Sequence, residues 1–266
     1  MSKRLPSHAR IVIIGGGIVG CSTAYHLAKM GIKDVILLER KSISSGTSWA
    51  AAGLLGQLWP TAALTKLAKY GADLYANLEK ETGQHTGYKR NGSIRIARTE
   101  ARKSEFKRAL GMARAFGIQM EEISKEAAKK LFPVMQVDDV VGAWYQPDDG
   151  VTNPEDTTQA LAKGARMGGV QIFEKTVVQD IRLKNGSIST VVTDRGTINC
   201  EVVVNCAGMW GREVGKMVGV HLPLLAAEHM HMTTEPIDKV YKDMPYLRDM
   251  DGYIYIKEEM GGLLIG

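Results

Sequence analysis

Three glycines near the N-terminus have the spacing of a turn that holds phosphate groups. Gly15, Gly17 and Gly20 form a G-x-G-x-x-G motif, which follows the apolar run Ile11–Ile14 and precedes an apolar pattern with helical spacing. In such a turn the first glycine permits a tight bend and the second lets backbone N–H groups approach a pyrophosphate. The third lets the helix and strand pack closely. The motif therefore favours a dinucleotide site over a strand–helix turn without a ligand.

An acidic residue completes this pattern. Glu39 follows the second apolar run, Val35–Leu38, at the distance from the glycines that a ribose-binding carboxylate has in such folds. A carboxylate at this place accepts hydrogen bonds from ribose hydroxyls and repels a 2′-phosphate. We therefore expect NAD or FAD rather than NADP.

The segment after Glu39 distinguishes between these two cofactors. Residues 44–58, SSGTSWAAAGLLGQL, carry no charge and have mostly small side chains. A large planar ring can lie against the backbone of such a loop, whereas NAD enzymes usually continue here into further strand–helix alternation. The stretch therefore favours FAD.

Hydrophobic periodicity predicts an α/β fold around these residues. Residues 11–38 have the pattern of a strand–helix–strand unit, 61–80 that of an amphipathic helix, and 84–147 those of a strand, two helices and an apolar strand. Asn153 as N-cap and Pro154 at the first helical position predict another helix. Several short strands follow, with a hairpin turn at Asn185-Gly186 and a buried parallel strand in VVVNCAG. The last 45 residues are strand-rich and end in an incomplete hairpin, so we expect them to belong to a longer polypeptide.

Composition and charge narrow the class of protein. The sequence is 44% hydrophobic and 24% charged, as is ordinary for a globular protein, and has a net charge of +5. Its basic residues are scattered, and the densest group, ARKSEFKRALGMAR, has the spacing of a solvated helix face, so neither nucleic acid nor a membrane is a predicted partner. The cysteines Cys21, Cys200 and Cys206 lie in apolar runs without CxxC spacing, which fits a reducing compartment.

Four segments, in order along nearly the whole chain, resemble the glycine oxidase/D-amino-acid oxidase superfamily, and more narrowly its dimethylglycine dehydrogenase and sarcosine dehydrogenase branch. They are VIIGGGIVGCSTAYHLAKMG, LLERKSISSGTSWAAAGLLGQL, QPDDGVTNPEDTTQALAKGARMGG and VVVNCAGMWGREVGKMVG. The resemblance implies FAD and an α/β fold in which a Rossmann-like FAD-binding domain is interleaved with a sheet-based substrate domain. We expect the FAD-binding domain at 1–83 and 148–220, and an incomplete substrate domain at 84–147 and 221–266.

The resemblance also implies which residues contact the cofactor. The turn residues Gly15, Gly17, Ile18, Val19 and Gly20 would hold the pyrophosphate, and Glu39 with Arg40 would hold the adenosine ribose. The isoalloxazine would be bordered by Ser45, Gly46, Thr47, Ser48, Ala51, Ala52, Gly53 and Leu54. Val178 would contact adenine through its backbone, and Ala207, Gly208 and Trp210 would close over the cofactor.

One position departs from the pattern of this branch. Its members typically carry a histidine after the tryptophan of the flavin loop, and that histidine is linked covalently to FAD; here Trp49 is followed by Ala50. Alanine has no nucleophilic atom, so we expect FAD to be bound non-covalently. Three interpretations stay open: an active member of the branch, a relative that has lost catalysis and keeps the fold as a regulatory or carrier subunit, and an engineered replacement of the histidine.

The candidates for substrate contact lie in the last 45 residues. Alternation along LLAAEHMHMTTEPI places His229 and His231 on one face of a predicted strand, and the resemblance places a histidine beside the flavin near this point. His229 is therefore the candidate for a substrate-side group, with a structural role as the alternative. Tyr253 and Tyr255 would share one face of another strand and form an aromatic wall for a methylated amine, with ordinary strand packing as the alternative. No metal site is predicted, because His229 and His231 lack further ligands with suitable spacing.

The predicted reaction is oxidation of an N-methylated amino acid such as dimethylglycine or sarcosine. A hydride passes from the N-methyl carbon to flavin N5, and the iminium product is hydrolysed or passed to tetrahydrofolate in a domain beyond Gly266. The electron acceptor would be oxygen or an electron-transfer flavoprotein, and the compartment the cytoplasm or the mitochondrial matrix. The alternatives are a non-catalytic regulatory relative, another amino-acid oxidase of the superfamily, and an NAD-dependent dehydrogenase.

Overall fold

The computed structural model describes residues 4–266, which divide into two compact units. The first unit comprises the described residues up to Ala51 together with Leu78–Thr86 and Pro154–Glu228. The second comprises Ala52–Asn77, Gly87–Asn153 and His229–Gly266. This division differs from the predicted boundaries chiefly at residues 52–77, which belong to the second unit.

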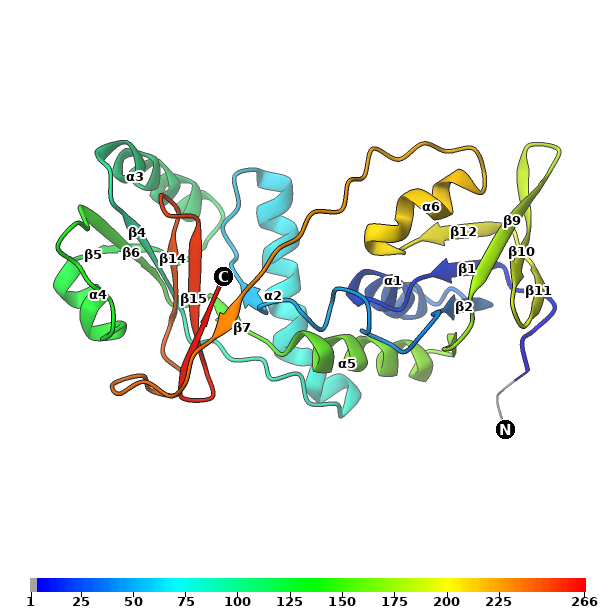
Figure 1. The fold of residues 1–266 in the computed structure, drawn as a ribbon, viewed down its shortest axis with the longest axis horizontal. Coiled ribbons are helices and arrows are strands. Elements are labelled where there is room, and N and C mark those ends of the chain that lie inside the picture. The colour runs from blue at the N-terminus through cyan, green and yellow to red at the C-terminus, as the bar shows by residue number, and fades with distance from the viewer. Residues whose placement is uncertain (1–3) are drawn as a thin grey trace. The chain divides into compact units, whose positions relative to one another are not determined.

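The first unit is built on a parallel sheet with strand order β12-β1-β2-β8 (Figure 1). Its strands are β1 (Ile11–Ile14), β2 (Val35–Leu38), β8 (Gln171–Phe173) and β12 (Val202–Asn205). The inner strands β1 and β2 are almost fully buried, as their apolar, β-branched sequences predict. The parallel pairing of β12 is confirmed, but its full burial was a wrong prediction: β12 is an edge strand with one neighbour, and Val202 is 43% exposed.

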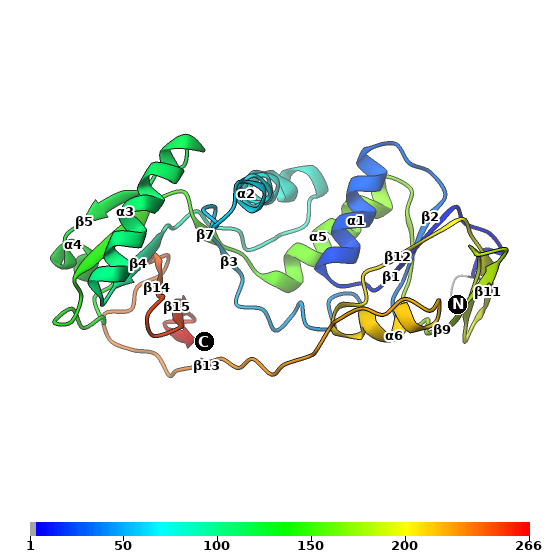
Figure 2. The ribbon, with the colours of Figure 1, turned by 90° about the horizontal axis from the view of Figure 1, so that it is seen from above.

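Two helices of the first unit, α1 (Ile18–Lys29) and α5 (Pro154–Met167), lie side by side (Figure 2). They approach closely because two glycines face α1, Gly164 within α5 and Gly168 in the turn directly after it. A Cβ atom on Gly164 would lie 2.7 Å from the ring of Tyr25, and one on Gly168 would lie 2.5 Å from the Cβ of Ala28. Helix α5 begins at Pro154, the residue predicted for its first position.

A three-stranded antiparallel sheet packs on the parallel sheet. Its strands are β9 (Val178–Lys184), β10 (Ser187–Thr193) and β11 (Gly196–Asn199). The apolar side chains of the two sheets share one core, to which the short helix α6 (Gly211–Lys216) adds Val214. The hairpin between β9 and β10 turns at Asn185 and Gly186, whose φ angles are 52° and 78°. Positive φ at both residues is the type I′ geometry that an Asn-Gly pair predicts.

The second unit is built on a seven-stranded sheet with order β13-β16-β15-β14-β4-β6-β5. In chain order the strands are β4 (Ser93–Ala97), β5 (Glu121–Ile123), β6 (Gly142–Gln146), β13 (Met232–Thr233), β14 (Tyr246–Asp249), β15 (Ile254–Glu259) and β16 (Gly262–Ile265). Strands β14 and β4 pair in parallel, and the other neighbours are antiparallel. A separate short pair joins β3 (Leu54–Leu55) to β7 (Gly150–Val151).

Side-chain alternation on β4 and β6 places two helices on opposite faces of this sheet. Ile94, Ile96 and Ala143 share a core with Phe132, which follows helix α4 (Lys125–Leu131). On the other face, Ala97 and Trp144 pack against Phe106 of helix α3 (Glu100–Ala115), with the Phe106 and Trp144 ring centroids 4.9 Å apart. The long helix α2 (Ala62–Thr82) matches the amphipathic helix predicted at 61–80.

A buried polar cluster lies in the second unit around Asp149. Its carboxylate accepts hydrogen bonds from the Ser93 hydroxyl at 2.6 Å, the Gln57 backbone N–H at 2.9 Å and the Tyr246 hydroxyl at 3.3 Å. The Arg95 guanidinium donates to the Leu58 carbonyl at 3.2 Å. Two of these contacts fix the backbone at residues 57–58, so the cluster holds the end of the small-residue stretch.

Candidate functional site

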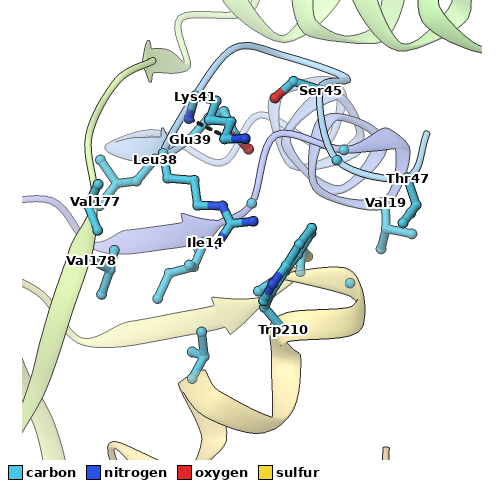
Figure 3. A pocket seen from close by; sticks show the side chains of 18 of the residues that line it. Ile14, Val19, Leu38, Glu39, Lys41, Ser45, Thr47, Val177, Val178 and Trp210 are labelled. Carbon is cyan, nitrogen blue, oxygen red and sulfur yellow. Dashed lines mark hydrogen bonds between the residues drawn. The ribbon is translucent and has the colours of Figure 1, made fainter. Parts of the chain in front are cut away.

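A cavity of about 340 Å³ lies in the first unit, where β1, β2 and β12 end (Figure 3). Parallel α/β sheets bind ligands at this edge. The lining comes from four separate parts of the chain, within 14–19, 38–48, 176–178 and 206–217. It includes these predicted cofactor residues: Gly15, Gly17, Ile18, Val19, Glu39, Arg40, Ser45, Gly46, Thr47, Ser48, Val178, Ala207, Gly208 and Trp210.

The glycine turn is closed so tightly that two of its glycines have no room for a side chain. Gly15 has a φ of +110°, and a Cβ atom there would lie 2.3 Å from the carbonyl oxygen of Cys206. A Cβ atom on Gly20 would lie 1.9 Å from the carbonyl oxygen of Gly15. Gly20 is buried behind the turn and does not line the cavity, so it acts through the packing of α1 on β1.

The first turn of α1 lies at the cavity, and a serine from a distant loop caps its backbone. The Ser48 hydroxyl accepts a hydrogen bond from the Ile18 N–H at 2.9 Å, and a Cβ atom on Gly17 would lie 3.1 Å from the same oxygen. The N-terminus of a helix carries partial positive charge and therefore favours an anionic group. The resemblance places Ser48 beside the flavin ring. No local pattern predicts its capping role, because N-cap patterns concern residues adjacent to the helix.

The Glu39 carboxylate is oriented by two backbone amides. Its Oε2 accepts from the Gly16 N–H at 2.7 Å and its Oε1 from the Lys41 N–H at 2.7 Å; Figure 3 shows Glu39 beside Lys41. A carboxylate has about four acceptor sites, so two more remain for hydroxyl groups. Gly16 is not one of the three motif glycines, but it also lacks room for a side chain. A Cβ atom there would lie 2.9 Å from the Cβ of Glu39.

Arg40 and Trp210 form a stacked pair beside the cavity. The Arg40 guanidinium carbon lies 3.9 Å from the centroid of the Trp210 ring. Trp210 ends the 3₁₀ turn η1 (Gly208–Trp210) after β12, whereas Arg40 follows β2. The pair therefore joins two chain segments that are far apart in sequence.

The cysteines near the turn are uncharged at neutral pH. Burial raises the pKa of the Cys21 thiol to about 12, and burial also raises the pKa of Cys206 above its usual value. A thiolate beside the turn would repel phosphate groups. Both residues instead contribute neutral, largely apolar side chains.

The other predicted cofactor residues lie outside this cavity. Ala51 is exposed at the edge of the first unit, whereas Ala52, Gly53 and Leu54 belong to the second. The Gly53 carbonyl accepts a hydrogen bond from the Thr152 N–H at 2.9 Å, and Leu54 pairs with Val151 across the β3–β7 ladder. Their place beside an isoalloxazine stays a prediction.

Two of the three substrate-side candidates lie together in the second unit. The rings of His229 and Tyr255 are 6.1 Å apart and nearly perpendicular. The strand predicted at His229 was wrong, since the first strand in this region is β13 at Met232–Thr233. Tyr253 does not alternate with Tyr255 on one strand: it lies in a turn with a φ of 55° and is 88% exposed.

The turn before β15 explains the position of Tyr253. The Asp249 carboxylate accepts hydrogen bonds from the backbone N–H groups of Asp251 and Gly252, at 3.0 and 2.9 Å. These contacts bend the chain after β14, so β15 begins only at Ile254. A short side chain that hydrogen-bonds its own backbone two residues on is typical of such turns.

Residues 4–266 contain neither a membrane-spanning helix nor a metal cluster. No helix in this range combines the length and the apolar character that a bilayer span requires. No three or more histidine, cysteine or acidic side chains in the same range are grouped so that they could hold a metal ion.

Comparison with known proteins places the chain among flavoproteins. The family model DAO, described as FAD dependent oxidoreductase, matches residues 10–266. Sarcosine dehydrogenase, mitochondrial, of Mus musculus is 40% identical over 271 residues, covering 100% of this chain and 29% of that protein. The pyruvate dehydrogenase phosphatase regulatory subunit, mitochondrial, of Mus musculus is 42% identical over 268 residues, covering 100% and 30%.

Solved structures agree with this result. The L-proline dehydrogenase from P. horikoshii superposes with a TM-score of 0.87 at 27% identity, over 98% of this chain and 70% of that one. The chain spans about 30% of the length of the two curated relatives above. The predicted superfamily, its sarcosine dehydrogenase branch and the α/β fold are confirmed. The chain belongs to the DAO family of FAD-dependent oxidoreductases.

Proposed function

We propose that this chain is the FAD-binding part of a flavoprotein that oxidises an N-methylated amino acid of the dimethylglycine or sarcosine type. The observation that carries the proposal is the closed glycine turn, which lies beside a Glu39 carboxylate already held by two backbone amides. The 40% identity to sarcosine dehydrogenase supports the choice of substrate class.

The cavity residues fit FAD. The N-terminus of α1 would stabilise the pyrophosphate, and the two free acceptor sites of Glu39 would bind the ribose hydroxyls. When bound, FAD supplies the two-electron acceptor for C–H oxidation. This chain's own residues bind and orient the cofactor, and we assign His229 and Tyr255 to the substrate side because their rings lie together. An aromatic face would attract a methylated ammonium group.

We expect FAD to be released intact when the protein is denatured. Ala50 stands where the branch carries its flavin-linking histidine, and its methyl group cannot form a bond to the ring. The measurement is a visible spectrum of the purified protein, followed by spectra of the supernatant and pellet after acid precipitation. All of the yellow colour should move to the supernatant.

An Ala50→His variant provides the matched comparison. If the loop borders the flavin as proposed, part of the colour should stay in the pellet of this variant. Colour retained in the wild-type pellet would show a covalent link at another residue and would contradict the assignment of Ala50.

Substitution of Glu39 should weaken FAD binding without unfolding the chain. A Glu39→Gln side chain still accepts one hydrogen bond, so we expect an FAD dissociation constant raised about 10-fold. Glu39→Ala leaves the Gly16 and Lys41 amides unpaired, and about 100-fold is expected. Fluorescence titration of apoprotein with FAD measures both values, and circular dichroism tests the fold. Unchanged FAD affinity in Glu39→Ala would show that Glu39 does not bind the cofactor.

A non-catalytic regulatory relative is the second candidate function. The 42% identity to the regulatory subunit of pyruvate dehydrogenase phosphatase favours it, as does the absence of a histidine at position 50. The two candidates differ in anaerobic reduction of the bound flavin. The proposed enzyme should bleach with sarcosine or dimethylglycine, a different amino-acid oxidase should bleach only with another amino acid such as glycine or proline, and a regulatory relative should bleach with none.

The remaining assignments follow from the substrate class and its chemistry. We propose oxygen or an electron-transfer flavoprotein as the acceptor, which the rate of reoxidation in air distinguishes. We also propose transfer of the one-carbon product to tetrahydrofolate, and a mitochondrial matrix or cytoplasmic location. The mitochondrial relatives support the former compartment.

A further inference from the structure

Arg40 has an unusual combination of contacts for an exposed arginine. Its guanidinium carbon lies over the Trp210 ring, 3.9 Å from the centroid, and Arg40 lines the cavity. Within residues 4–266, no carboxylate lies within ion-pair distance of Arg40 and no hydrogen bond involves its guanidinium. The contact with the ring therefore leaves the five N–H donors of the guanidinium without a partner among these residues.

Two contacts help to position Trp210. The Trp210 backbone N–H donates to the Ala207 carbonyl at 3.0 Å, and the residue caps helix α6. A Cβ atom on Gly46 would lie 3.6 Å from the ring carbon Cζ3, so the loop before Trp49 also reaches this side chain. In Figure 3, Trp210 lies across the cavity from Val178. These contacts place the indole against the guanidinium.

We propose that Arg40 and Trp210 form a latch that retains FAD in the absence of a covalent bond. Trp210 is the positioning residue: it holds the guanidinium so that its free N–H edge donates to a phosphate oxygen of the cofactor. The inference rests on the proposed non-covalent FAD site. Because the Trp210 ring positions the guanidinium, little side-chain ordering is needed when the cofactor binds.

The latch predicts that the two side chains act as one unit. An anionic ligand binds more tightly to an ordered guanidinium than to a mobile one, because less rotamer freedom is lost for each hydrogen bond formed. Removing Trp210 should therefore remove much of the contribution of Arg40. A lysine at position 40 keeps the charge but cannot present a stacked planar fork.

A double-mutant cycle on FAD affinity tests this. Apoproteins of the wild type, Arg40→Met, Trp210→Ala and the double variant are titrated with FAD, and the quenching of flavin fluorescence gives each dissociation constant. We expect an increase of about 50-fold for Arg40→Met and about 10-fold for Trp210→Ala. The double variant should reach only about 50- to 100-fold, well below the product of the two single effects. Arg40→Lys should resemble Arg40→Met.

Arg212→Met is the matched control. Arg212 is an exposed arginine of α6 that does not line the cavity, so its removal should change the dissociation constant by less than about twofold. Multiplicative effects in the double variant, or wild-type affinity in Arg40→Lys, would overturn the latch and leave the proposed function intact. A wild-type protein that binds no FAD would overturn both.

Discussion

We expect the substitution Gly20→Ala to weaken FAD binding severely. The new Cβ atom would lie 1.9 Å from the Gly15 carbonyl oxygen, so either α1 or the turn must move. Both partners are fixed, because Gly15 in turn lies against the Cys206 backbone and has a φ of +110°. Neither the first turn of α1 nor the Gly15–Gly17 backbone then keeps its place beside the cavity. The backbone N–H groups and the helix N-terminus then no longer meet the pyrophosphate, so we expect the FAD dissociation constant to rise by at least about 100-fold.

Gly111→Ala is the control for this prediction. Gly111 lies within helix α3, and a Cβ atom there meets nothing within 4 Å. Alanine has the higher helix propensity, so this variant should be slightly more stable, by about 0.5 to 1 kcal/mol, and should bind FAD normally. Thermal unfolding and FAD titration of the two variants test the pair of expectations. Normal FAD affinity in Gly20→Ala would show that the turn tolerates displacement.

The second large effect concerns Asp149. Removal of its carboxylate in Asp149→Ala leaves the Ser93 hydroxyl, the Gln57 N–H and the Tyr246 hydroxyl without their acceptor in a buried place. Each unsatisfied group in such a place costs about 1 to 3 kcal/mol. We expect a loss of about 3 kcal/mol, or roughly 6 to 12 °C in melting temperature for a chain of this size.

The neighbouring acid supplies the control. Asp148 forms a surface ion pair with Arg90 at 3.4 Å, and such pairs contribute about 0 to 1 kcal/mol. Asp148→Ala should therefore change the melting temperature by less than about 3 °C. Equal effects in the two alanine variants would show that the buried cluster contributes no more to stability than a surface pair.

The same carboxylate should make stability depend on pH. Burial raises the pKa of Asp149, so the folded chain holds this proton more tightly than the unfolded chain does. Its contribution to stability is therefore complete below the unfolded pKa, near 4, and is lost as pH rises through the folded pKa. Asp149→Asn cannot titrate. The advantage of the wild type over this variant in melting temperature should shrink from pH 4 to pH 8.

Local sequence patterns predicted much of the fold and the centre of the site. The spacing of Gly15, Gly17 and Gly20 after an apolar strand identified the turn, and Glu39 followed at the expected distance. Asn185-Gly186 predicted a hairpin of the observed type, because both residues tolerate positive φ. In each case the physical cause lies within a few neighbouring residues.

Contacts between distant residues were not predictable in the same way. The cap of Ser48 on α1, the stack of Arg40 on Trp210 and the cluster around Asp149 each join segments that only the folded chain brings together. Strand alternation also failed near the C-terminal end of the sequence. A side chain that turns the chain, as Asp249 does before Tyr253, stops the period of two.

The position of β1 between β2 and β12 has a consequence for biosynthesis. Ile11 pairs with Val35 on one side and with Val202 on the other, so one neighbour is made at once and the other only after most of this chain has left the ribosome. Residues 206–210, which form one side of the cavity, follow β12 and are therefore synthesised late. The complete cavity therefore forms only late in synthesis. Supply of the vitamin precursor of FAD should protect the completed protein from degradation without speeding its first steps of folding.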